Sequence, residues 1–526
     1  MKRRDFIKYA GITAGAASFP FQGFGINPMP RLPFLQALAE GGNPNGRVLV
    51  LIQMIGGNDG LNTYIPIDQY DHLAQHRGSV LIPENQVLAL SGVGNAGLHP
   101  AMNQLREMFD NGLVSVVQNV GYPNQDYSHF RSTDIWMSAS DSDQYLSTGW
   151  LGRYLQYEYP DYPNGYPNPD MPDPLAIQIG ALSSLALMGN PNPMGFAITD
   201  PQSFYQFVSD LVEPAPNSPY GDELEFIRLI TNQAQVYYNA IKNAADAGDN
   251  LSSLYPDPEI NPLADQLKIV ARLISGGLKT PIYIVTIEGF DTHAEQVQAG
   301  DTVNGLHAVL LGQLSEAVGA FQNDLELLGV ADKVAGMTFS EFGRTIASNA
   351  SIGTDHGAAA PLFVFGKNVI PGVIGANAQI PNQLDDSADV PMQHDFRSVY
   401  ASALQDWFGV NNPESILQYE FPILPIFVAP SSGIHNVVND NASVVSLYPN
   451  PVQQSATIRF DLAVASRVSI VILDVNGRPL RTVVSNNFYP AGRHEITLDR
   501  GNLPSGQYFY QLRTDGGVVT KQMVAI

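Results

Sequence analysis

Acidic residues and histidines recur beside the apolar runs of this sequence. Asp59, Asp291 and Glu341 each follow such a run closely. His293 lies two positions after Asp291, and His356 comes shortly before a further apolar run. Carboxylate oxygens together with imidazole nitrogens suit Zn, Mn, Mg or Ca, and a bound cation can neutralise charge that develops on a phosphoryl or sulfuryl group. These residues therefore predict a site for one or two divalent metal ions.

A second set of polar residues could act on an anionic ester held at such a site. Ser128 is a candidate nucleophile, with Thr133 as the alternative, because a nearby cation activates a hydroxyl. His129, Arg131 and Arg344 are candidates for binding the anionic group, and arginine can do so through two parallel hydrogen bonds. These four residues, Ser128 included, are the predicted catalytic group.

Each of these residues also has an ordinary structural interpretation. Asp59 stands in a glycine-rich stretch and could form a turn, and Asp291 or Ser128 could cap a helix. His356 could be a structural histidine. What favours a shared site is the recurrence of such residues beside successive apolar runs.

The composition narrows the possible partners. The chain has 526 residues, which suggests roughly two to four domains. Hydrophobic residues make up 44% of the chain, so it can bury a large core. The net charge of −23 disfavours binding to nucleic acid or to an anionic membrane. Because the chain has no cysteine, disulfides, thiolate nucleophiles and Cys-ligated zinc are excluded.

Apolar runs that alternate with helical patterns predict an α/β fold in the central part of the chain. Runs of this kind fit strands that are buried on both faces of a mostly parallel sheet, with helices covering both faces. Ligands of such sheets bind beyond the carboxyl ends of the strands. The predicted strands are 47–57, 113–121, 175–180, 281–290, 334–340 and 361–366, and the predicted helices are 221–246, 262–276 and 304–328.

The N-terminus predicts export. Arg3 and Arg4, followed by Phe6 and a short, weakly apolar, Ala/Gly-rich segment, resemble a twin-arginine signal. We assign residues 1–43 to this signal and an irregular approach segment, and the twin-arginine translocase is then a partner. The apolar segment is too short to span a bilayer, and we predict no transmembrane segment in the chain.

The C-terminal part has a different pattern. From residue 444 onward, short runs of alternating apolar and polar residues predict strands, and Asn476-Gly477 predicts a hairpin turn. We therefore expect a small β-sandwich over residues 444–526, joined by a polar linker, 430–443, to a core domain of residues 44–429.

The tail resembles the type A sorting domain of the type IX secretion system. This resemblance implies recognition by the outer-membrane export machinery, with passage through the periplasm to the cell surface or the extracellular space. The matching stretches are "LYPNPV", "DVNGRPL", "PAGRHEITLD", "LPSGQYFYQLRT" and the final "KQMVAI".

The core resembles the DUF1501 family, which is related to the alkaline phosphatase and sulfatase superfamily. This resemblance implies an alkaline-phosphatase-like, doubly wound sheet with two metal ions flanking a nucleophile. The stretches that carry it are "GGNDGLNT", "YSHFRSTDIW", "GWLGRYL", "GFDTH", "TFSEFGRT", "DHGAAAPLFVFG" and "HDFRSVYASALQDWFG".

The resemblance also distributes the candidate ligands between two metal positions. It implies that Asp291, His293 and His356 hold one ion, with Asp355 in a supporting role outside the set of ligands. Asp59 and Glu341 belong to the other position, with Ser128 or Asn58 as a further candidate. Phe342 stands where the superfamily has a histidine, so this second position is expected to be oxygen-rich, weaker, and better suited to magnesium or calcium than to zinc.

The sequence thus predicts an exported metal-dependent hydrolase of phosphate or sulfate esters, acting on an anionic small molecule or a glycan. An alternative is a non-catalytic surface protein whose degenerate cleft binds a glycan or an anionic polymer, with Phe342 marking the loss of catalysis. A third possibility is a structural component of the envelope whose remaining ligands only hold loops together.

Overall fold

The computed structural model describes three stretches of the chain. These are residues 46–200, 236–428 apart from 386, and 442–525 apart from 449–451, 463–464, 474–478, 502 and 515–516. The predicted export signal lies outside the described residues, as does nearly all of the predicted linker. Among the helices of the described stretches, none has the length and apolarity needed to cross a membrane.

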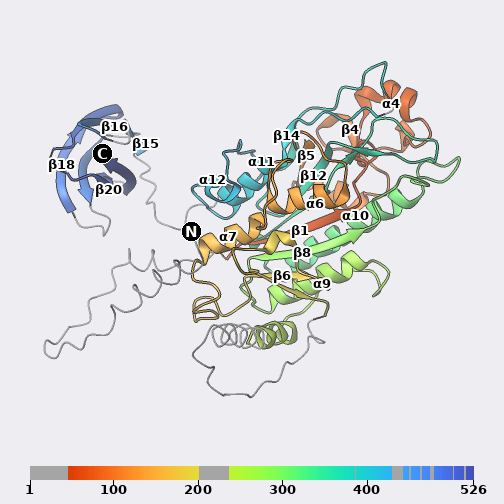
Figure 1. The fold of residues 1–526 in the computed structure, drawn as a ribbon, viewed down its shortest axis with the longest axis horizontal. Helices are drawn as coiled ribbons and strands as arrows, with labels where there is room; N and C mark the ends of the chain where they lie inside the picture. Colours follow the sequence, from red (N-terminus) through yellow and green to blue (C-terminus); the bar gives the residue numbers. More distant parts are fainter. Residues whose placement is uncertain are drawn as a thin grey trace. The chain divides into compact units, whose positions relative to one another are not determined.

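A nine-stranded sheet forms the centre of the core, in the order β13-β5-β12-β9-β1-β8-β6-β7, with β14 also paired to β5 (Figure 1). Each of the six predicted strands is present, with boundaries that differ from the prediction by at most two residues. The strands are β1 (Val48–Ile55), β5 (Val114–Gly121), β6 (Ala176–Ile179), β7 (Phe196–Ile198), β8 (Ile282–Glu288), β9 (Val334–Phe339), β12 (Ala360–Phe365), β13 (Gly372–Ile374) and β14 (His394–Asp395).

The sheet is mostly parallel, as predicted. β1 is parallel to its neighbours β8 and β9, whereas β12 runs antiparallel to both β9 and β5. The carboxyl ends of β1, β5, β8 and β9 therefore lie at one edge of the sheet. Because β12 runs the other way, its first residue lies at that same edge. The residues that follow β1, β5, β8 and β9 therefore lie at the same edge as the residues that precede β12.

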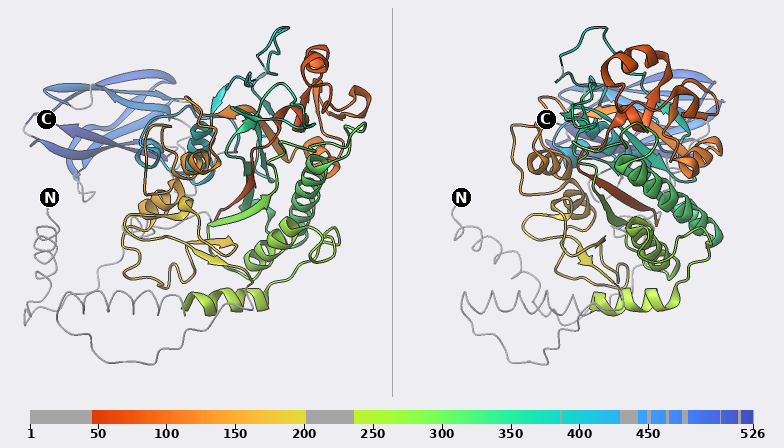
Figure 2. Two further views of the ribbon diagram at one scale, coloured as in Figure 1. Left: turned by 45° about the vertical axis from the view of Figure 1, so that its right-hand side comes forward. Right: turned by 90° about the vertical axis from the view of Figure 1, so that its right-hand side faces the viewer.

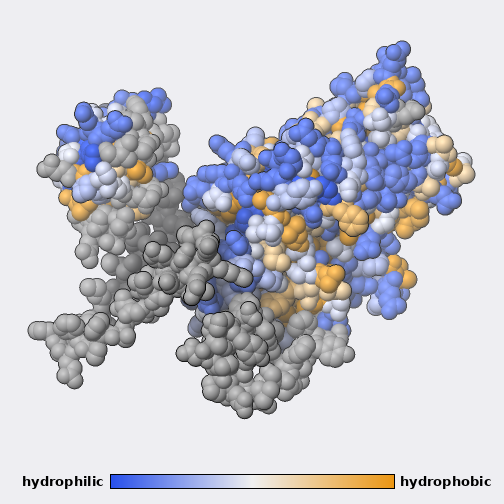
Figure 3. Space-filling model, in the orientation of Figure 1, coloured by the Kyte–Doolittle hydropathy of each residue, from blue (hydrophilic) through white to orange (hydrophobic). Residues whose placement is uncertain are grey.

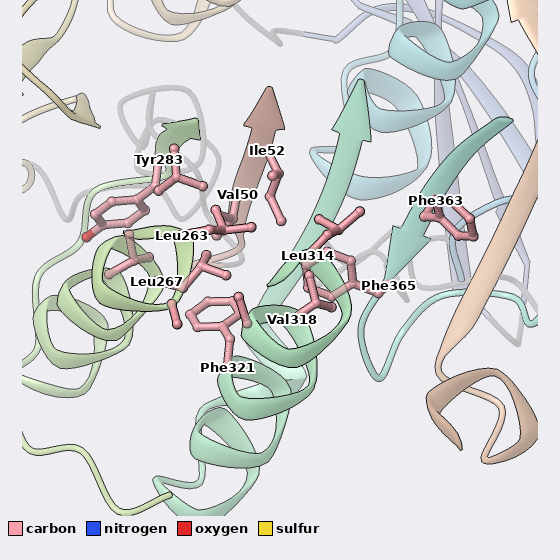
Figure 4. Packing of buried hydrophobic residues seen from close by; sticks show 14 of the residues in the cluster. Val50, Ile52, Leu263, Leu267, Tyr283, Leu314, Val318, Phe321, Phe363 and Phe365 are labelled. Atoms are coloured by element: carbon pink, nitrogen blue, oxygen red, sulfur yellow. The ribbon is translucent and has the colours of Figure 1, made fainter. Parts of the chain in front are cut away.

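Helices cover both faces of this sheet, and the alternation of side chains along β1 shows why. Val50 and Ile52 belong to one buried apolar cluster with α9 and α10, and Leu49 and Leu51 belong to another with α6, α7 and α11 (Figures 1, 2 and 4). Successive side chains of a strand point to opposite faces, so a continuous apolar run needs a layer on each side. This arrangement confirms the predicted α/β fold with helices on both faces.

The helices agree with the periodicity of the sequence. The predicted helices 304–328 and 262–276 are α10 and α9, and Gly329, with φ +71°, ends the first of them. Residues 236–247 are helical, which is the described part of the predicted helix 221–246. The principal helices are α5 (Asn103–Asp110), α6 (His129–Ser138), α7 (Trp150–Glu158), α9 (Pro262–Ser275), α10 (Leu306–Leu327) and α11 (Phe396–Ser402), with a π-helical turn at Ala403–Trp407.

Shorter elements line the edge where the strands end. A three-stranded sheet has the order β2-β4-β3, and β10 pairs with β11. These elements are α3 (Gly60–Thr63), β2 (Tyr64–Pro66), α4 (Tyr70–Arg77), β3 (Leu88–Leu90), β4 (Val93–Leu98), β10 (Gly343–Arg344) and β11 (His356–Gly357). Further along the chain, α12 (Glu414–Leu417) packs against α7 and α11.

The C-terminal part forms two antiparallel sheets, with the orders β15-β16-β19 and β18-β17-β20-β21. Ile458 and Phe460 of β16 share a buried cluster with Ile470 and Ile472 of β17, so the two sheets enclose one core. This confirms the predicted β-sandwich. The strands are β15 (Ala442–Tyr448), β16 (Ser455–Leu462), β17 (Ser466–Leu473), β18 (Pro479–Tyr489), β19 (Gly492–Asp499), β20 (Gly506–Thr514) and β21 (Gly517–Ala525).

Candidate metal centre

Asp291 lies among three histidine side chains at the edge where the strands end. Its Oδ1 is 3.3 Å from His293 Nε2 and 3.4 Å from His356 Nε2, and its Oδ2 is 3.4 Å from His129 Nε2. Donor atoms of His129, Asp291 and His356 all lie within 4.8 Å of one another. Two donors of a tetrahedral zinc site are about 3.3 Å apart, given metal–nitrogen bonds of about 2.0–2.1 Å. The spacing around Asp291 therefore fits a bound metal ion.

The sheet brings these four residues together from three distant parts of the chain. His129 is the first residue of α6, which follows β5. Asp291 and His293 come after β8, and His356 lies in β11, shortly before β12. These positions converge because β5 and β8 end at the edge where β12 begins. His129 and His356 are nevertheless separated in sequence by more than half the length of the core domain.

A hydrogen bond orients each imidazole through its other ring nitrogen. His129 Nδ1 lies 2.9 Å from Glu341 Oε1, and His293 Nδ1 lies 2.8 Å from Asp355 Oδ1. His356 Nδ1 lies 2.7 Å from the carbonyl oxygen of Tyr127. All three partners accept hydrogen bonds, so each Nδ1 carries a proton, and each Nε2 faces the carboxylate of Asp291, where a bound metal ion would take the place of any proton on that nitrogen. Metal-binding histidines in proteins are held in this way.

Glu341 and Asp355 each bond to a histidine of the centre. Glu341 is buried, and its Oε1 accepts hydrogen bonds from His129 and from the N–H of Gly56 at 2.8 Å. Asp355, expected in a supporting role at this site, accepts a hydrogen bond from His293. Partial burial alone would raise the pKa of Asp355, but hydrogen bonds from Asn349 and His293 outweigh it and lower that pKa.

Arg344 joins the loops that surround the centre. Its buried guanidinium donates to the carbonyl oxygens of Gly57 at 2.8 Å and Thr354 at 2.9 Å, and to Asp291 Oδ1 at 2.8 Å. Further bonds go to the carbonyl oxygens of Gly56 and Phe290. Burial raises the pKa of Asp291, but the hydrogen bond and charge of Arg344 lower it overall. Arg344 thus has a different role from the anion binding that we predicted.

Asp59 belongs to a separate buried group. Its Oδ2 pairs with Arg77 Nη2 of α4 and accepts a hydrogen bond from Gln296 Nε2 at 2.6 Å. The side chains of Asp59 and Arg77 are both fully buried. Burial raises the pKa of Asp59, and the charges of Arg77 and His307 with the hydrogen bonds of Gln296 and Arg77 lower it overall. The contacts of Asp59 are therefore with a protein cation and an amide, and not with the centre around Asp291.

The remaining predicted residues lie at the start of α6. Ser128 is exposed, and its hydroxyl makes no capping hydrogen bond to α6 in the described chain. Arg131 is buried and donates to the carbonyl oxygens of Asp141, Ser142 and Gln144, with its guanidinium 4.0 Å from the ring centre of Tyr145. Arg131 thus holds the loop that follows α6.

Phe342 forms an apolar wall beside the centre. It is 1% exposed, and its ring centre lies 4.9 Å from that of His129 and 4.4 Å from that of His356. It also packs against Gly57, which has φ +84°, and a Cβ built there would lie 2.3 Å from Phe342 Cε2. Glycine at position 57 is therefore required by both its backbone conformation and this contact.

The structure brings together His129, Asp291, His293, Glu341 and His356 of the predicted set, and it places Asp59 and Arg131 in other groups. Sequence reasoning assigned His129 to anion binding, whereas its Nε2 lies beside Asp291. It missed the Tyr127 carbonyl, Arg77 and Gln296. The position of His129 could have been predicted from the sequence. It is the first residue of a helix that follows a buried strand, and such a residue lies at the edge of the sheet where ligands bind.

Two family models match the chain. Residues 247–419 match the family described as "Protein of unknown function (DUF1501)", and residues 446–526 match "Secretion system C-terminal sorting domain". The first match includes Asp291, His293, Glu341 and His356, but it begins after His129. No curated protein matches the chain.

Several solved structures are similar at low identity. A protein from a study of glycosaminoglycan metabolism by Bacteroides thetaiotaomicron is 10% identical, with 90% of this chain and 88% of that chain covered and a TM-score of 0.35. A protein of the alkaline phosphatase superfamily from Vibrio parahaemolyticus is 11% identical, with 93% and 91% covered and a TM-score of 0.31. A phosphonate monoester hydrolase from Silicibacter pomeroyi is 10% identical, with 91% and 89% covered and a TM-score of 0.30. These similarities are too weak to assign residues of the site.

Proposed function

We propose that this chain, a DUF1501 protein with a secretion-system sorting domain, is an exported metal-dependent hydrolase of phosphate or sulfate esters. The observation that supports this most directly is the convergence of three imidazole Nε2 atoms on Asp291, at 3.3 and 3.4 Å. Three imidazoles and one carboxylate are a donor set that favours zinc or manganese over magnesium or calcium.

Asp291, His129, His293 and His356 are the proposed ligands. A divalent ion bound there would polarise the ester and lower the pKa of a bound water. Glu341, Asp355 and the Tyr127 carbonyl hold the imidazoles through their Nδ1 atoms, so that the Nε2 atoms are oriented before the ion binds.

The reaction would replace one single bond to phosphorus or sulfur with another. The oxygen of a water, or of Ser128 in a first step that water later completes, forms a bond to the phosphorus or sulfur atom. The bond to the ester oxygen breaks, and that oxygen takes up a proton to leave as an alcohol. Ser128 is suited to the first role because its hydroxyl is exposed and immediately precedes His129.

The C-terminal sorting domain indicates where in or outside the cell the protein acts. A secretion-system sorting domain directs a protein toward the cell surface or the extracellular space. We propose that the type IX machinery recognises this tail and that the twin-arginine signal predicted in residues 1–43 brings the folded chain to the periplasm first. An ester carried by an extracellular small molecule or glycan is then the substrate.

Metal content and ester hydrolysis test the proposal. Purified wild-type protein should bind zinc or manganese and hydrolyse aryl phosphate or sulfate esters, and both properties should be lost in His293→Ala and His356→Ala. His76→Ala is the matched control, because His76 lies on α4 and the hydrogen bond of its imidazole goes to the carbonyl of Pro381, away from the centre. Wild-type protein with neither bound metal nor hydrolysis across added metals would refute the proposal, as would unchanged metal content in both variants.

A second candidate, glycan binding without catalysis, is favoured by exposed aromatic side chains beside the centre. Phe130 follows His129 in α6 and is 88% exposed, and Tyr127 is 44% exposed. Exposed aromatic rings of this kind often mark binding surfaces. If this candidate is right, neutral oligosaccharides will bind equally well to wild type and to His356→Ala, and Phe130→Ser will weaken that binding.

A further inference from the structure

Asn349, a loop residue with no assigned role so far, contacts His293 at its backbone and also contacts the group that holds its ring. Asn349 Nδ2 donates to the carbonyl oxygen of His293 at 2.8 Å and to Asp355 Oδ1 at 3.0 Å. Asp355 Oδ1 is the same oxygen that lies 2.8 Å from His293 Nδ1. One amide nitrogen therefore connects the backbone of His293 with the carboxylate that orients its imidazole.

The partners of Asn349 fix the orientation of its amide. Oδ1 accepts hydrogen bonds from the N–H groups of Ser351 at 2.9 Å and Gly353 at 3.2 Å. Two donors thus face the amide oxygen, and two acceptors, on His293 and Asp355, face the amide nitrogen. Turning the amide over would lose all four hydrogen bonds, because an amide nitrogen accepts none and an amide oxygen donates none.

The turn that Asn349 closes lies directly against the segment that carries His293. The N–H of Glu295 donates to the carbonyl oxygen of Ser351 at 3.0 Å. A Cβ built on Gly353 would lie 2.4 Å from the carbonyl oxygen of His293, so only glycine permits this approach. A change at Asn349 therefore acts on His293 through short, direct contacts.

Asp355 needs an anchor because its contact with His293 is open to water. The side chain of Asp355 is 58% exposed and that of His293 is 43% exposed. A polar contact at such a position gains little, and it costs side-chain entropy to hold both groups in one geometry. The hydrogen bond from Asn349 restricts Asp355 to the rotamer in which its Oδ1 meets the imidazole.

We propose that Asn349 is a positioning residue of the candidate metal centre, which sets His293 in place through its backbone carbonyl and through Asp355. This inference rests on the proposed function, in which His293 is a metal ligand. It adds a residue that would not contact the ion but would determine how well one ligand is oriented before the ion binds.

Metal affinity of the full-length protein carrying Asn349→Ser tests this role. A serine hydroxyl can still accept the N–H groups of the turn, but it is too short to reach both His293 and Asp355. The Kd for the metal that the wild type binds, zinc or manganese, should rise by about tenfold or more in competition with a chelator. Asn304→Ser is the matched control and should leave the Kd unchanged, because Asn304 is exposed and its Nδ2 donates to Asp301 Oδ2 at 2.7 Å.

A double-mutant cycle separates positioning from a general loss of order in the loop. Asp355→Ala removes one of the two groups through which Asn349 acts, so Asn349→Ser should raise the Kd by a smaller factor in that background than in the wild type. The full factor is expected in Glu341→Gln, because Glu341 holds His129 and shares no hydrogen-bond partner with Asn349 in the described chain. Equal factors in all three backgrounds would overturn the inference.

Asn349→Asp provides a second variant, which keeps the oxygen that closes the turn and lacks the amide donors. It should also raise the Kd, although its added negative charge by itself would favour a cation. Wild-type protein that binds the metal, with a Kd that is no higher in either Asn349 variant, would overturn this inference and leave the proposed function intact. Wild-type protein that binds neither zinc nor manganese would refute the proposed function and this inference together.

Discussion

Each histidine of the candidate metal centre uses its two ring nitrogens for different purposes. Nδ1 of His129, His293 and His356 is held by an acceptor, and Nε2 points toward Asp291. An acceptor that is a carboxylate also raises the basicity of the imidazole that it holds. At the scale of single residues, the centre therefore depends on Glu341 and Asp355 as well as on the four residues that would contact an ion.

Removing the charge of these supporting carboxylates should weaken metal binding without abolishing it. We expect Glu341→Gln and Asp355→Asn each to raise the Kd for zinc by roughly 10- to 100-fold. Asp332→Asn is the matched control, because Asp332 is exposed and pairs only with Lys367 at the surface in the described chain. Competition with a zinc chelator measures the Kd, and urea unfolding of the metal-free proteins separates a positioning effect from general destabilisation. Unchanged Kd values in both variants would contradict the positioning role.

Two buried histidines, His99 and His307, should make the stability of the fold sensitive to mild acid. Burial lowers the pKa of His99 to about 3 and that of His307 to about 4, and Nε2 of His307 bonds to Asn58 Oδ1 at 3.0 Å. Between pH 6.5 and about 4 the unfolded chain binds protons at these positions and the folded chain does not. The free energy of unfolding should therefore fall as the pH drops through this window, by up to about 1.4 kcal/mol per pH unit for each histidine.

Urea unfolding at a series of pH values measures this dependence. His307→Asn should flatten the profile between pH 6.5 and 4, and His76→Gln, at a partly exposed histidine of α4, should leave the wild-type slope unchanged. A wild-type stability that stays constant from pH 7 to pH 4 would show that these histidines do not titrate as their burial requires.

At the scale of secondary-structure elements, the antiparallel strand β12 decides which residues can meet. If it ran parallel to β5 and β9, His356 would lie at the opposite edge of the sheet from Asp291. Its reversal brings the residues before β12 to the edge where β5, β8 and β9 end. Close packing of the loops at this edge then requires small residues, and Gly56 and Gly57 supply them directly after β1.

A pair of glycine substitutions isolates the contribution of this packing. Gly57 and Gly329 both have positive φ, at +84° and +71°, but no described atom lies within 4 Å of a Cβ built at Gly329. Gly329→Ala should cost about 1 kcal/mol of unfolding free energy from its backbone alone. Gly57→Ala should cost about 1–3 kcal/mol more because of the contact with Phe342, and it should also weaken metal binding. Equal losses in urea unfolding would show that Phe342 does not constrain this loop.

At the scale of the whole molecule, the core and the C-terminal sandwich each have their own apolar interior. The buried cluster of the sandwich contains only residues from 452 onward, and the two large clusters of the core end at residue 427. The described surface is mainly hydrophilic in the view of Figure 3, with separate hydrophobic patches. Separate interiors indicate that the metal centre and the sorting function can be tested independently.

Removal of the sandwich should separate secretion from metal binding. A chain that ends at residue 441 should keep the metal content and the unfolding midpoint of the core, and it should no longer reach the cell surface or the medium. Cell fractionation with metal analysis of the purified protein measures both. The full chain carrying Arg459→Ala, which removes a surface ion pair with Glu495, is the control that should still be exported. Loss of metal from the shortened chain would contradict the independence of the two parts.

The amino-acid sequence by itself determined the elements and the edge at which the site lies. Apolar runs such as 47–57 and 334–340 place their strands to within two residues, because burial on both faces of a sheet leaves a local pattern. For the same reason, residues that follow these runs were recognisable as candidates before their contacts were known. For His356 the local pattern indicates only a position near a strand end, and the edge of the sheet at which it lies depends on the antiparallel direction of β12.

Only the tertiary structure decided how those candidates are paired. Asp59 and Glu341 look alike in sequence, since both are acids that follow a buried strand. Arg77 of α4 neutralises the first, and His129 of α6 binds the second. The partners lie on helices whose positions are set by packing on the sheet, and no local pattern encodes which side chain a helix will bring to a given carboxylate. The distinction between a metal ligand, a supporting carboxylate and a buried ion pair is therefore a property of the folded molecule.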